Sequence, residues 1–331
     1  METNMANNIE ILHESVLVST SDYLRIEKPE RIQEQLSVKV TRHCFQPRFD
    51  DFESDWVAQV AVPAFKVYRQ QRGGAAVDSF CSIGTGSGLD VLSAVEILGA
   101  TRVGLTDVHE DVVAAATDNI ARNYNQRHPL TIESGYGDLL APLRPYAAPY
   151  DVIYENLPNI LLQSTEEVVA ERNSSAYLPP RTEILPELVR QQMLDLHYLA
   201  LVQAREFLLP GGAVLSCLGA RVPLHVFHSL AELAGYVPSF LTYSWKVQGD
   251  PELISDYERN QENGFGPFFF YRAEVLQARF KHVGIAESGE NALEIERSLL
   301  PHRLDPACAY AAFKNGERIG HTVAVLKSEL R

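Results

Sequence analysis

The chain has 331 residues, with 43 acidic and 29 basic side chains and a formal charge of −14. This length suggests about two folding units, or one large α/β domain with additions. The acidic balance argues against a nucleic-acid binder, because phosphate contacts require a basic face.

Secretion, membrane insertion and disulfide bonding are not expected. Residues 1–15 have no basic and apolar leader, and no stretch approaches the ~18 apolar residues of a membrane span. The four cysteines are scattered without CxxC spacing, which is typical of reduced thiols. We therefore expect a cytoplasmic protein.

The first 71 residues fall into two parts. Residues 1–56 mix charges with short apolar runs, and we interpret them as a helical or mixed cap that packs on the rest. Residues 56–71 have helical spacing and end before Gly73 and Gly74, which predicts a helix and its stop.

Strand and helix patterns then alternate. Short apolar strands are expected at residues 75–83, 101–106, 130–134, 150–155 and 213–218. Helical patterns lie between them, the longest over residues 185–208. Such alternation predicts right-handed crossovers and a mostly parallel sheet. The predicted fold is therefore α/β and Rossmann-like.

The pattern changes after residue 245. Residues 246–265 are polar and predict an insertion, and the aromatic run at 266–276 predicts a buried strand. Two later apolar runs flank Asn315-Gly316, a strong hairpin signal that predicts an extension of the sheet. We divide the chain into a cap, a binding domain, and an insertion with sheet extension, over residues 1–56, 57–245 and 246–331.

A glycine-rich turn follows the first predicted strand. Glycines there let the backbone approach a bound nucleotide. An acid at the end of the second strand can bind both ribose hydroxyls, an acid after the third can accept from an adenine amino group, and a polar residue follows the fourth. Ligands of such sheets bind at this edge. The expected cofactor-binding residues are Ser82, Gly84, Thr85, Gly86, Gly88, Asp107, Val108, Asp138, Leu139 and Asn156.

The ligand could be NAD or S-adenosylmethionine. The turn reads G-T-G-S-G and lacks the G-x-G-x-x-G spacing of dinucleotide sites. The glycine turn, the strand-end acid, Gly137-Asp138 and the Asn-x-Pro loop together resemble the class I S-adenosylmethionine-dependent methyltransferases over residues 57–245. The resemblance implies that fold and S-adenosylmethionine as substrate or methyl donor, and we expect no metal.

Two departures from that family concern the substrate. Ser82 stands where the family carries an acid that helps hold the amino end of the methionine moiety. Enzymes that methylate planar nitrogens carry Asn/Asp-Pro-Pro followed by a stacking aromatic, and the loop Asn156-Leu157-Pro158-Asn159 lacks that aromatic. We therefore expect a small, non-planar, amino-acid-like substrate, and neither a nucleic-acid nor a membrane partner.

Two further resemblances are more specific. YENLPNILL, PGGAVLSCLGARVP and FKNGERIGHTVAVLKSEL resemble stretches of the N-terminal module of plant methionine S-methyltransferases, which implies a methionine-like second ligand. In its length, and in combining a Rossmann unit with an N-terminal segment, the chain resembles bacterial azetidine-2-carboxylate synthases. That resemblance implies cyclisation of S-adenosylmethionine to azetidine-2-carboxylate and methylthioadenosine, in natural-product biosynthesis.

The chemistry of cyclisation suggests roles for individual residues. Attack of the α-amine on Cγ requires a neutral amine, and a neighbouring acid would favour the ammonium form. Ser82 and Asn156 are neutral and suit that requirement. An aromatic face against the sulfonium would add a cation–π contact of ~1–2 kcal/mol. The predicted catalytic residues are Asn156 and Tyr177, with Tyr136 and Tyr154 as other candidates for the aromatic face.

Other interpretations remain open. The chain could be a methyltransferase acting on methionine or another small acceptor, or a binding protein that kept the pocket without catalysis. His225 and His228 are three residues apart on a predicted helix, but no third metal ligand lies near them in the sequence. A homodimer also stays open.

Overall fold

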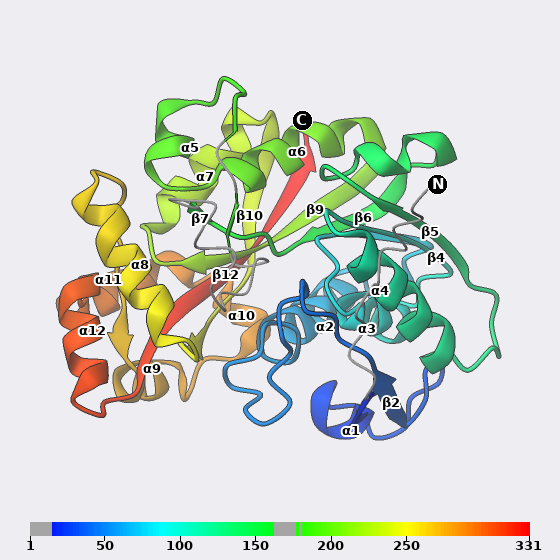
Figure 1. Ribbon diagram of the computed structural model, residues 1–331, viewed down its shortest axis with the longest axis horizontal. Helices are drawn as coiled ribbons and strands as arrows, with labels where there is room; N and C mark the ends of the chain where they lie inside the picture. Colours follow the sequence, from blue (N-terminus) through cyan, green and yellow to red (C-terminus); the bar gives the residue numbers. More distant parts are fainter. Residues whose placement is uncertain (1–14, 162–176, 179–180) are drawn as a thin grey trace, which may run out of the picture.

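The computed structural model describes residues 15–161, 177–178 and 181–331 (Figure 1). Its main sheet has the strand order β5-β4-β3-β6-β9-β12-β10, and only β12 runs antiparallel to its neighbours. This arrangement confirms the predicted Rossmann-like fold of class I methyltransferases. In the order of the sheet, the strands are Thr131–Tyr136, Arg102–Asp107, Ser79–Ile83, Tyr150–Glu155, Leu208–Ala220, Ile319–Leu330 and Tyr236–Val247.

Helices cover both faces of this sheet (Figure 1). Successive strand residues alternate between two cores: Phe80 and Val152 face one, while Cys81 and Ile153 face the other. Because both faces are buried, the strands are continuously apolar. The first core lies against η1 (Val57–Ala61), α2 (Val62–Gln71), α3 (Leu89–Ile97) and α4 (Glu110–Asn123). The second lies against η2 (Ala141–Tyr146), α5 (Glu187–Gln191), α6 (Asp195–Phe207) and α7 (Leu224–Leu233).

The described part of the N-terminal cap is mainly a small antiparallel ladder. β1 (Val16–Ser19) pairs with β2 (Gln35–Val38), and the helix between them, α1 (Thr20–Tyr23), has four residues. Of the two alternatives predicted for the cap, helical or mixed, the described part is mixed, and a purely helical cap is ruled out. The reason is local: Leu36 and Val38 alternate with polar residues and are buried, which is the period of a strand.

Two asparagines fasten the cap to α4. The side-chain amide of Asn119 accepts from Lys39 N (2.9 Å) and donates to Lys39 O (2.8 Å), and Asn123 makes the same two bonds with Ser37 at 2.7 and 2.9 Å. Residues four apart on a helix thus pair with residues two apart on a strand. Asn119 also donates to Ser87 O at 3.0 Å, which ties the glycine turn to the same clamp.

Three further predictions are corrected, two of them in the C-terminal part. The run at 306–314 is a helix, α12 (Pro306–Lys314), because Asp305 caps it by accepting from Cys308 N, and Asn315-Gly316 ends it rather than turning a hairpin. The predicted extension of the sheet is nevertheless confirmed by β12.

The other two corrections concern the aromatic run at 266–276 and the long helix predicted over residues 185–208. Only Tyr271–Arg272 of the aromatic run forms a strand, β11, which pairs with β12. The helix expected over 185–208 is divided into α5 and α6 around Met193, whose φ is +53°. The remaining helices are α8 (Pro251–Glu262), α9 (Ala273–Phe280), α10 (Ile285–Ser288), α11 (Ala292–Leu299) and η4 (Leu300–His302).

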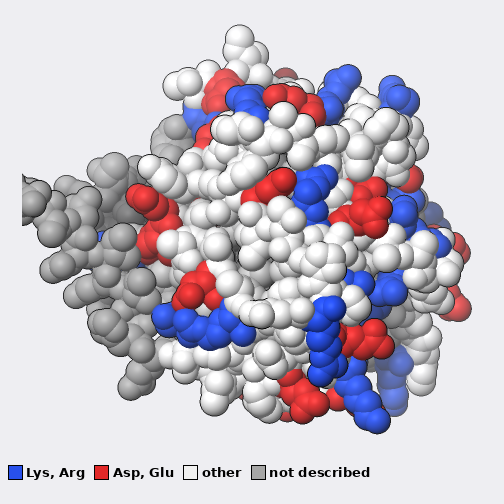
Figure 2. All heavy atoms as spheres, turned by 90° about the vertical axis from the view of Figure 1, so that its right-hand side faces the viewer, with Lys and Arg blue, Asp and Glu red and all other residues white. Residues whose placement is uncertain are grey.

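The surface and the thiols agree with the composition. On the face drawn in Figure 2, acidic and basic residues are interspersed, and the described residues form no continuous basic patch there. Among the described helices, none combines the length and the apolar character that crossing a membrane requires. All four cysteines are unbridged, as predicted.

The clamp predicts the effect of one substitution. Asn119→Ala would leave the backbone groups of Lys39 and the Ser87 carbonyl without partners, at ~1–3 kcal/mol for a buried polar group. We expect a loss of roughly 2–4 kcal/mol in the free energy of unfolding, measured by urea denaturation, and faster proteolysis of residues 15–56. Asn315→Ala, at an exposed helix end, is the control. Equal stability of the two variants would show that the clamp contributes little.

Candidate active site

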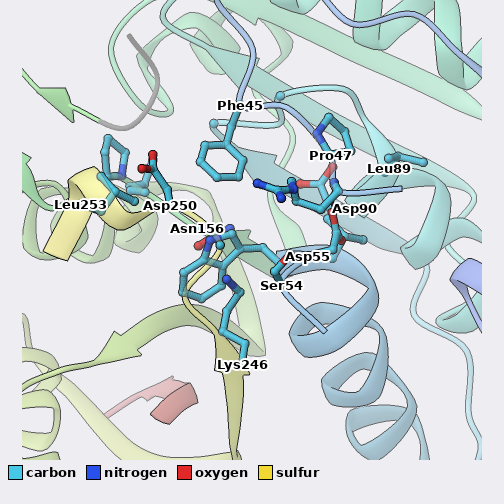
Figure 3. A pocket seen from close by; sticks show the side chains of 18 of the residues that line it. Phe45, Pro47, Ser54, Asp55, Leu89, Asp90, Asn156, Lys246, Asp250 and Leu253 are labelled. Atoms are coloured by element: carbon cyan, nitrogen blue, oxygen red, sulfur yellow. Dashed lines mark hydrogen bonds between the residues drawn. The ribbon is translucent and has the colours of Figure 1, made fainter. Parts of the chain in front are cut away.

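A cavity lies at the carboxyl edge of the parallel strands (Figure 3). Of the predicted cofactor-binding residues, Gly84, Thr85, Gly86 and Asn156 line it, whereas Ser82, Gly88, Asp107, Val108, Asp138 and Leu139 do not. One wall is the glycine turn after β3, and another is the loop at 156–159 after β6. The cap supplies a third wall, and residues that follow β9 and end β10 form its floor. The lining includes Tyr23, Trp56, Gly84, Thr85, Asp90, Asn156, Arg221 and Lys246.

The glycine turn has the conformation that its sequence requires. Gly84, Gly86 and Gly88 have φ values of +68°, +54° and +78°, a backbone conformation that residues with a side chain rarely adopt. A Cβ on Gly84 would lie 3.0 Å from Leu157 Cδ2, so the turn approaches the loop after β6 closely. Thr106 O accepts from Gly84 N at 2.8 Å, which fixes the turn to β4.

Asp107 lies at the end of β4, as predicted. Its carboxylate accepts from Gly86 N (3.3 Å) and His109 N (3.2 Å), so it also holds the glycine turn. Burial raises its pKa, although these hydrogen bonds lower it. Val108 beside it is 66% exposed and presents an apolar surface. These contacts do not test whether Asp107 binds the ribose hydroxyls, so that role stays a prediction.

Asp138 is engaged by an arginine that the sequence did not point to. Arg181 binds it through two hydrogen bonds of 2.7 and 3.1 Å, and Gln203 Nε2 lies 3.5 Å from the same carboxylate. Leu139 is buried with a φ of +49°. An adenine amino group at Asp138 would therefore share the carboxylate with Arg181, and this role also stays a prediction.

Asn156 is a predicted residue whose side-chain amide has no hydrogen-bond partner among the described residues. It follows β6, is half-buried, and lines the cavity (Figure 3). Its side chain makes no hydrogen bond to another described residue, whereas the nearby Asn159 donates to Met193 O at 2.9 Å. The amide of Asn156 is thus available to a ligand.

A buried ion pair supports the loop that carries Asn156. Glu155, the last residue of β6, lies 2.7 Å from His197 Nδ1, and both side chains are at most 1% exposed. His197 Nε2 is in turn 3.5 Å from Asn159 Oδ1. The pair joins α6 to the loop. In the sequence, the feature that pointed to it was the acidic residue at the end of an apolar strand.

The three tyrosines proposed to face the sulfonium lie in different parts of the structure. The backbone of Tyr177 lies in β8 (Tyr177–Leu178), paired with Ile160 of β7 (Ile160–Leu161), and its side chain is outside the described part. Tyr136 is 57% exposed at the end of β5, while Tyr154 is buried and lines the cavity. Trp56 also lines the cavity, and the sequence analysis did not select it.

Asp90 is the functional candidate that the sequence analysis missed. It lies in the first turn of α3, is 4% exposed and lines the cavity (Figure 3). Ser82 Oγ and Thr85 Oγ1 donate to its carboxylate, and Val91 N donates at 2.8 Å. Burial raises its pKa to about 6, although these hydrogen bonds lower it. A carboxyl group therefore lies against Ser82, which is itself fully buried, and the expectation that only neutral groups surround this part of the site is corrected.

A cluster near the glycine turn has the donors of a metal site. His43 Nδ1 lies 3.0 Å from Asp111 Oδ1, and the rings of His43 and His109 stack with centroids 4.6 Å apart. Their ligand atoms all lie within 4.8 Å of one another. The hydrogen bond between His43 and Asp111 explains the cluster without an ion. His225 and His228, by contrast, belong to no such group among the described residues.

No family model matches the chain, and no curated protein matches it. Solved structures do. A methyltransferase from Pyrococcus furiosus is 17% identical over 55% of this chain and 76% of its own, with a TM-score of 0.36. YcgJ from Bacillus subtilis is 10% identical over 81% and 98%, with a TM-score of 0.41. The cyclopropane synthase MmaA2 from Mycobacterium tuberculosis is 14% identical over 82% and 84%, with a TM-score of 0.36.

The burial of Asp90 predicts a pH dependence of stability. Its pKa is about 6 in the folded protein against an ordinary 3.8, so between these values the folded state holds a proton that the unfolded state lacks. The free energy of unfolding should therefore fall as pH rises through this window. Asp90→Asn should remove that slope and raise stability at pH 8 by about 2–3 kcal/mol.

Urea denaturation at pH 4.5, 6 and 8 measures this effect. The matched control is Asp78→Asn, an exposed carboxylate just before β3. If Asp90→Asn is no more stable than the parent at pH 8, then ionisation of Asp90 does not lower the free energy of unfolding.

Proposed function

We propose that the chain binds S-adenosylmethionine along the glycine turn, with Asp107 at the ribose and Asn156 toward the methionine end. The observation that carries this proposal is the gathering of three elements at one edge of a sheet with this strand order. These are a glycine turn in the left-handed region, of which Gly84 and Gly86 line the cavity, the acid that ends the next strand and holds that turn, and an amide with no partner among the described residues. Such edges are where open α/β sheets bind ligands.

We further propose that the reaction is cyclisation of this molecule to azetidine-2-carboxylate and methylthioadenosine. The sulfonium makes Cγ electrophilic; the α-nitrogen bonds to Cγ, and the Cγ–S electron pair leaves with sulfur. Before that step, the ammonium group must lose a proton. Asp90 is the proposed acceptor, because it is buried in the same cavity and its pKa of about 6 lies closer to that of an amine than an ordinary carboxylate's does.

Other side chains would orient the reacting chain. Asn156 can hydrogen-bond the amino-acid end, and Trp56 offers an aromatic face within the same cavity. Holding a flexible chain in a curled form is an orientation effect, which can lower a barrier by several kcal/mol. The role of Tyr177 in this orientation stays a proposal on the sequence alone.

Methyl transfer to a small amino-acid-like acceptor is the second candidate. Two buried cations, Arg221 and Lys246, line the same cavity, and they could bind the carboxylate of a separate acceptor. Methyl transfer is an in-line displacement that depends mainly on positioning, so it requires no further base.

The deciding experiment is incubation of the pure protein with S-adenosylmethionine alone, followed by mass spectrometry. Enzyme-dependent methylthioadenosine together with a four-carbon imino acid would support cyclisation. A reaction without protein is the control, because the sulfonium decomposes slowly in water. S-adenosylhomocysteine formed only after an amino acid is added would overturn cyclisation in favour of methyl transfer. Absence of binding by calorimetry would overturn both, and tight binding without any product would indicate a binding protein.

The proposed ribose contact predicts a loss of affinity. Asp107→Ala removes two hydrogen bonds worth about 1 kcal/mol each, so the Kd for S-adenosylmethionine should rise roughly 30-fold in calorimetry. Asp78→Ala, at the other end of β3, should leave the Kd unchanged. The melting temperature must be recorded as well, because Asp107 also holds the glycine turn. An unchanged Kd for Asp107→Ala would place the ribose elsewhere.

A further inference from the structure

Two cations lie buried at the floor of the cavity. Arg221 directly follows β9 and is 5% exposed; Lys246 lies near the end of β10 and is 4% exposed. Both line the cavity together with Asn156, and Figure 3 shows the Lys246 side chain rising from its strand toward that residue. These two strands end beside the loop that carries Asn156, on the side away from β4 and Asp107.

Arg221 is held by neutral groups. Its Nη2 donates to Gln248 Oε1 at 2.8 Å, and its Nη1 lies 3.4 Å from the Tyr257 hydroxyl. The guanidinium also lies over the rings of Tyr257 and Phe270, 4.8 and 5.5 Å from their centroids. Its Nε has no hydrogen-bond partner among the residues that the structure describes. The side chain is therefore fixed in place without being neutralised.

Lys246 is likewise without an acidic partner among the described residues. Its Nζ donates to Val247 O at 3.1 Å and lies 4.8 Å from the centroid of the Trp56 ring. Burial, and next the charge of Arg221, lower its pKa to about 7. Its neighbour across the strands, His321, stays neutral, because burial and the same two cations lower its pKa.

Asp55, the acid whose charge acts on Lys246, is already used by the fold. Asp55 favours the charged form of Lys246, but its carboxylate accepts from the Tyr23 hydroxyl and from Ala58 N, both at 2.8 Å, and from Arg48 N at 2.9 Å. Two buried charges of the same sign are costly unless an anion compensates them. An arginine fork and a lysine ammonium together match a carboxylate.

We propose that Arg221 and Lys246 form a carboxylate-binding subsite for the amino-acid end of the substrate. The inference rests on the proposed function, because it assigns ligand chemistry to the same cavity. The carboxylate has two sources: the methionine moiety of S-adenosylmethionine itself, or a separate amino-acid acceptor. In either case the substrate class is a free α-amino acid and not an ester, an amide or an amine.

Substitutions in the ligand-free protein test the first consequence. At pH 6, below the Lys246 pKa of about 7, Lys246→Met removes an uncompensated buried charge and should raise the melting temperature. Arg303→Met is the matched control, because Arg303 is also largely buried but pairs with Glu296 at 3.1 Å, so that variant should melt lower. Arg221→Met removes both the charge and the planar guanidinium group, whereas Arg221→Lys removes the guanidinium geometry and keeps a positive charge. A lower melting temperature for Lys246→Met would count against an uncompensated cation.

Ligand pairs that differ only in the carboxylate identify its source. If the source is S-adenosylmethionine itself, the parent should bind it about 10- to 100-fold more tightly than its decarboxylated analogue, the range of a charge-assisted hydrogen bond. Lys246→Met and Arg221→Met should lose that preference while binding the analogue as the parent does.

If the source is an acceptor, the variants should bind S-adenosylmethionine normally. L-methionine, but not L-methioninol, should then raise the melting temperature of the parent loaded with S-adenosylhomocysteine, and the variants should lose this response. Folded variants that keep every carboxylate preference of the parent would overturn the subsite, as would a parent that shows none.

A parent protein that fails to bind S-adenosylmethionine would overturn the proposed function alone. The subsite is then decided by the L-methionine and L-methioninol pair on the unliganded protein: discrimination lost in the variants supports it, and no discrimination overturns it.

Discussion

The pocket depends on one side-chain amide. Asn119 of α4 binds both backbone groups of Lys39 in the cap and the Ser87 carbonyl in the glycine turn. The same residue therefore sets the distance between a wall of the cavity and the turn that faces it. Tyr23 and Trp56 reach the cavity from the cap side, and Tyr23 in turn anchors Asp55. Without this attachment, the glycine turn would be exposed to solvent at the edge of the sheet.

The cavity concentrates groups whose charged forms are disfavoured by burial. The pKa of Asp90 is raised to about 6 and that of Lys246 is lowered to about 7, each mainly by burial. Groups perturbed in this way cluster at functional sites more often than elsewhere, because folding alone would favour replacing them with apolar residues. An acid on α3 and a cation on β10 also give the cavity a polarity along its length. A zwitterionic amino acid has the matching polarity, whereas a flat neutral base does not.

The sequence predicted the part of the fold that depends on local patterns. The parallel strands, the glycine turn and the placement of Asp107 and Asn156 followed from periodicity and from residues within a few positions of a strand end. Asp90 escaped because it lies on a helix, eight residues after the serine that it contacts. Arg221 and Lys246 escaped for a different reason: their shared environment arises only when β12 brings β9 and β10 to the same edge. The helix at 306–314 was mistaken for a strand because Asn-Gly suits a helix end as well as a hairpin, and the Asp305 cap decides between them.

The position of β12 sets an order of assembly. β10 joins the sheet only through β12, a strand of residues 319–330 that inserts between it and β9. During synthesis, the glycine turn, Asp107 and Asn156 can come together while the chain is still growing, since their strands pair with one another. Lys246 cannot take its place until the β12 residues leave the ribosome. The part of the cavity at the glycine turn can therefore form before the part that holds the buried ammonium group, which requires β12.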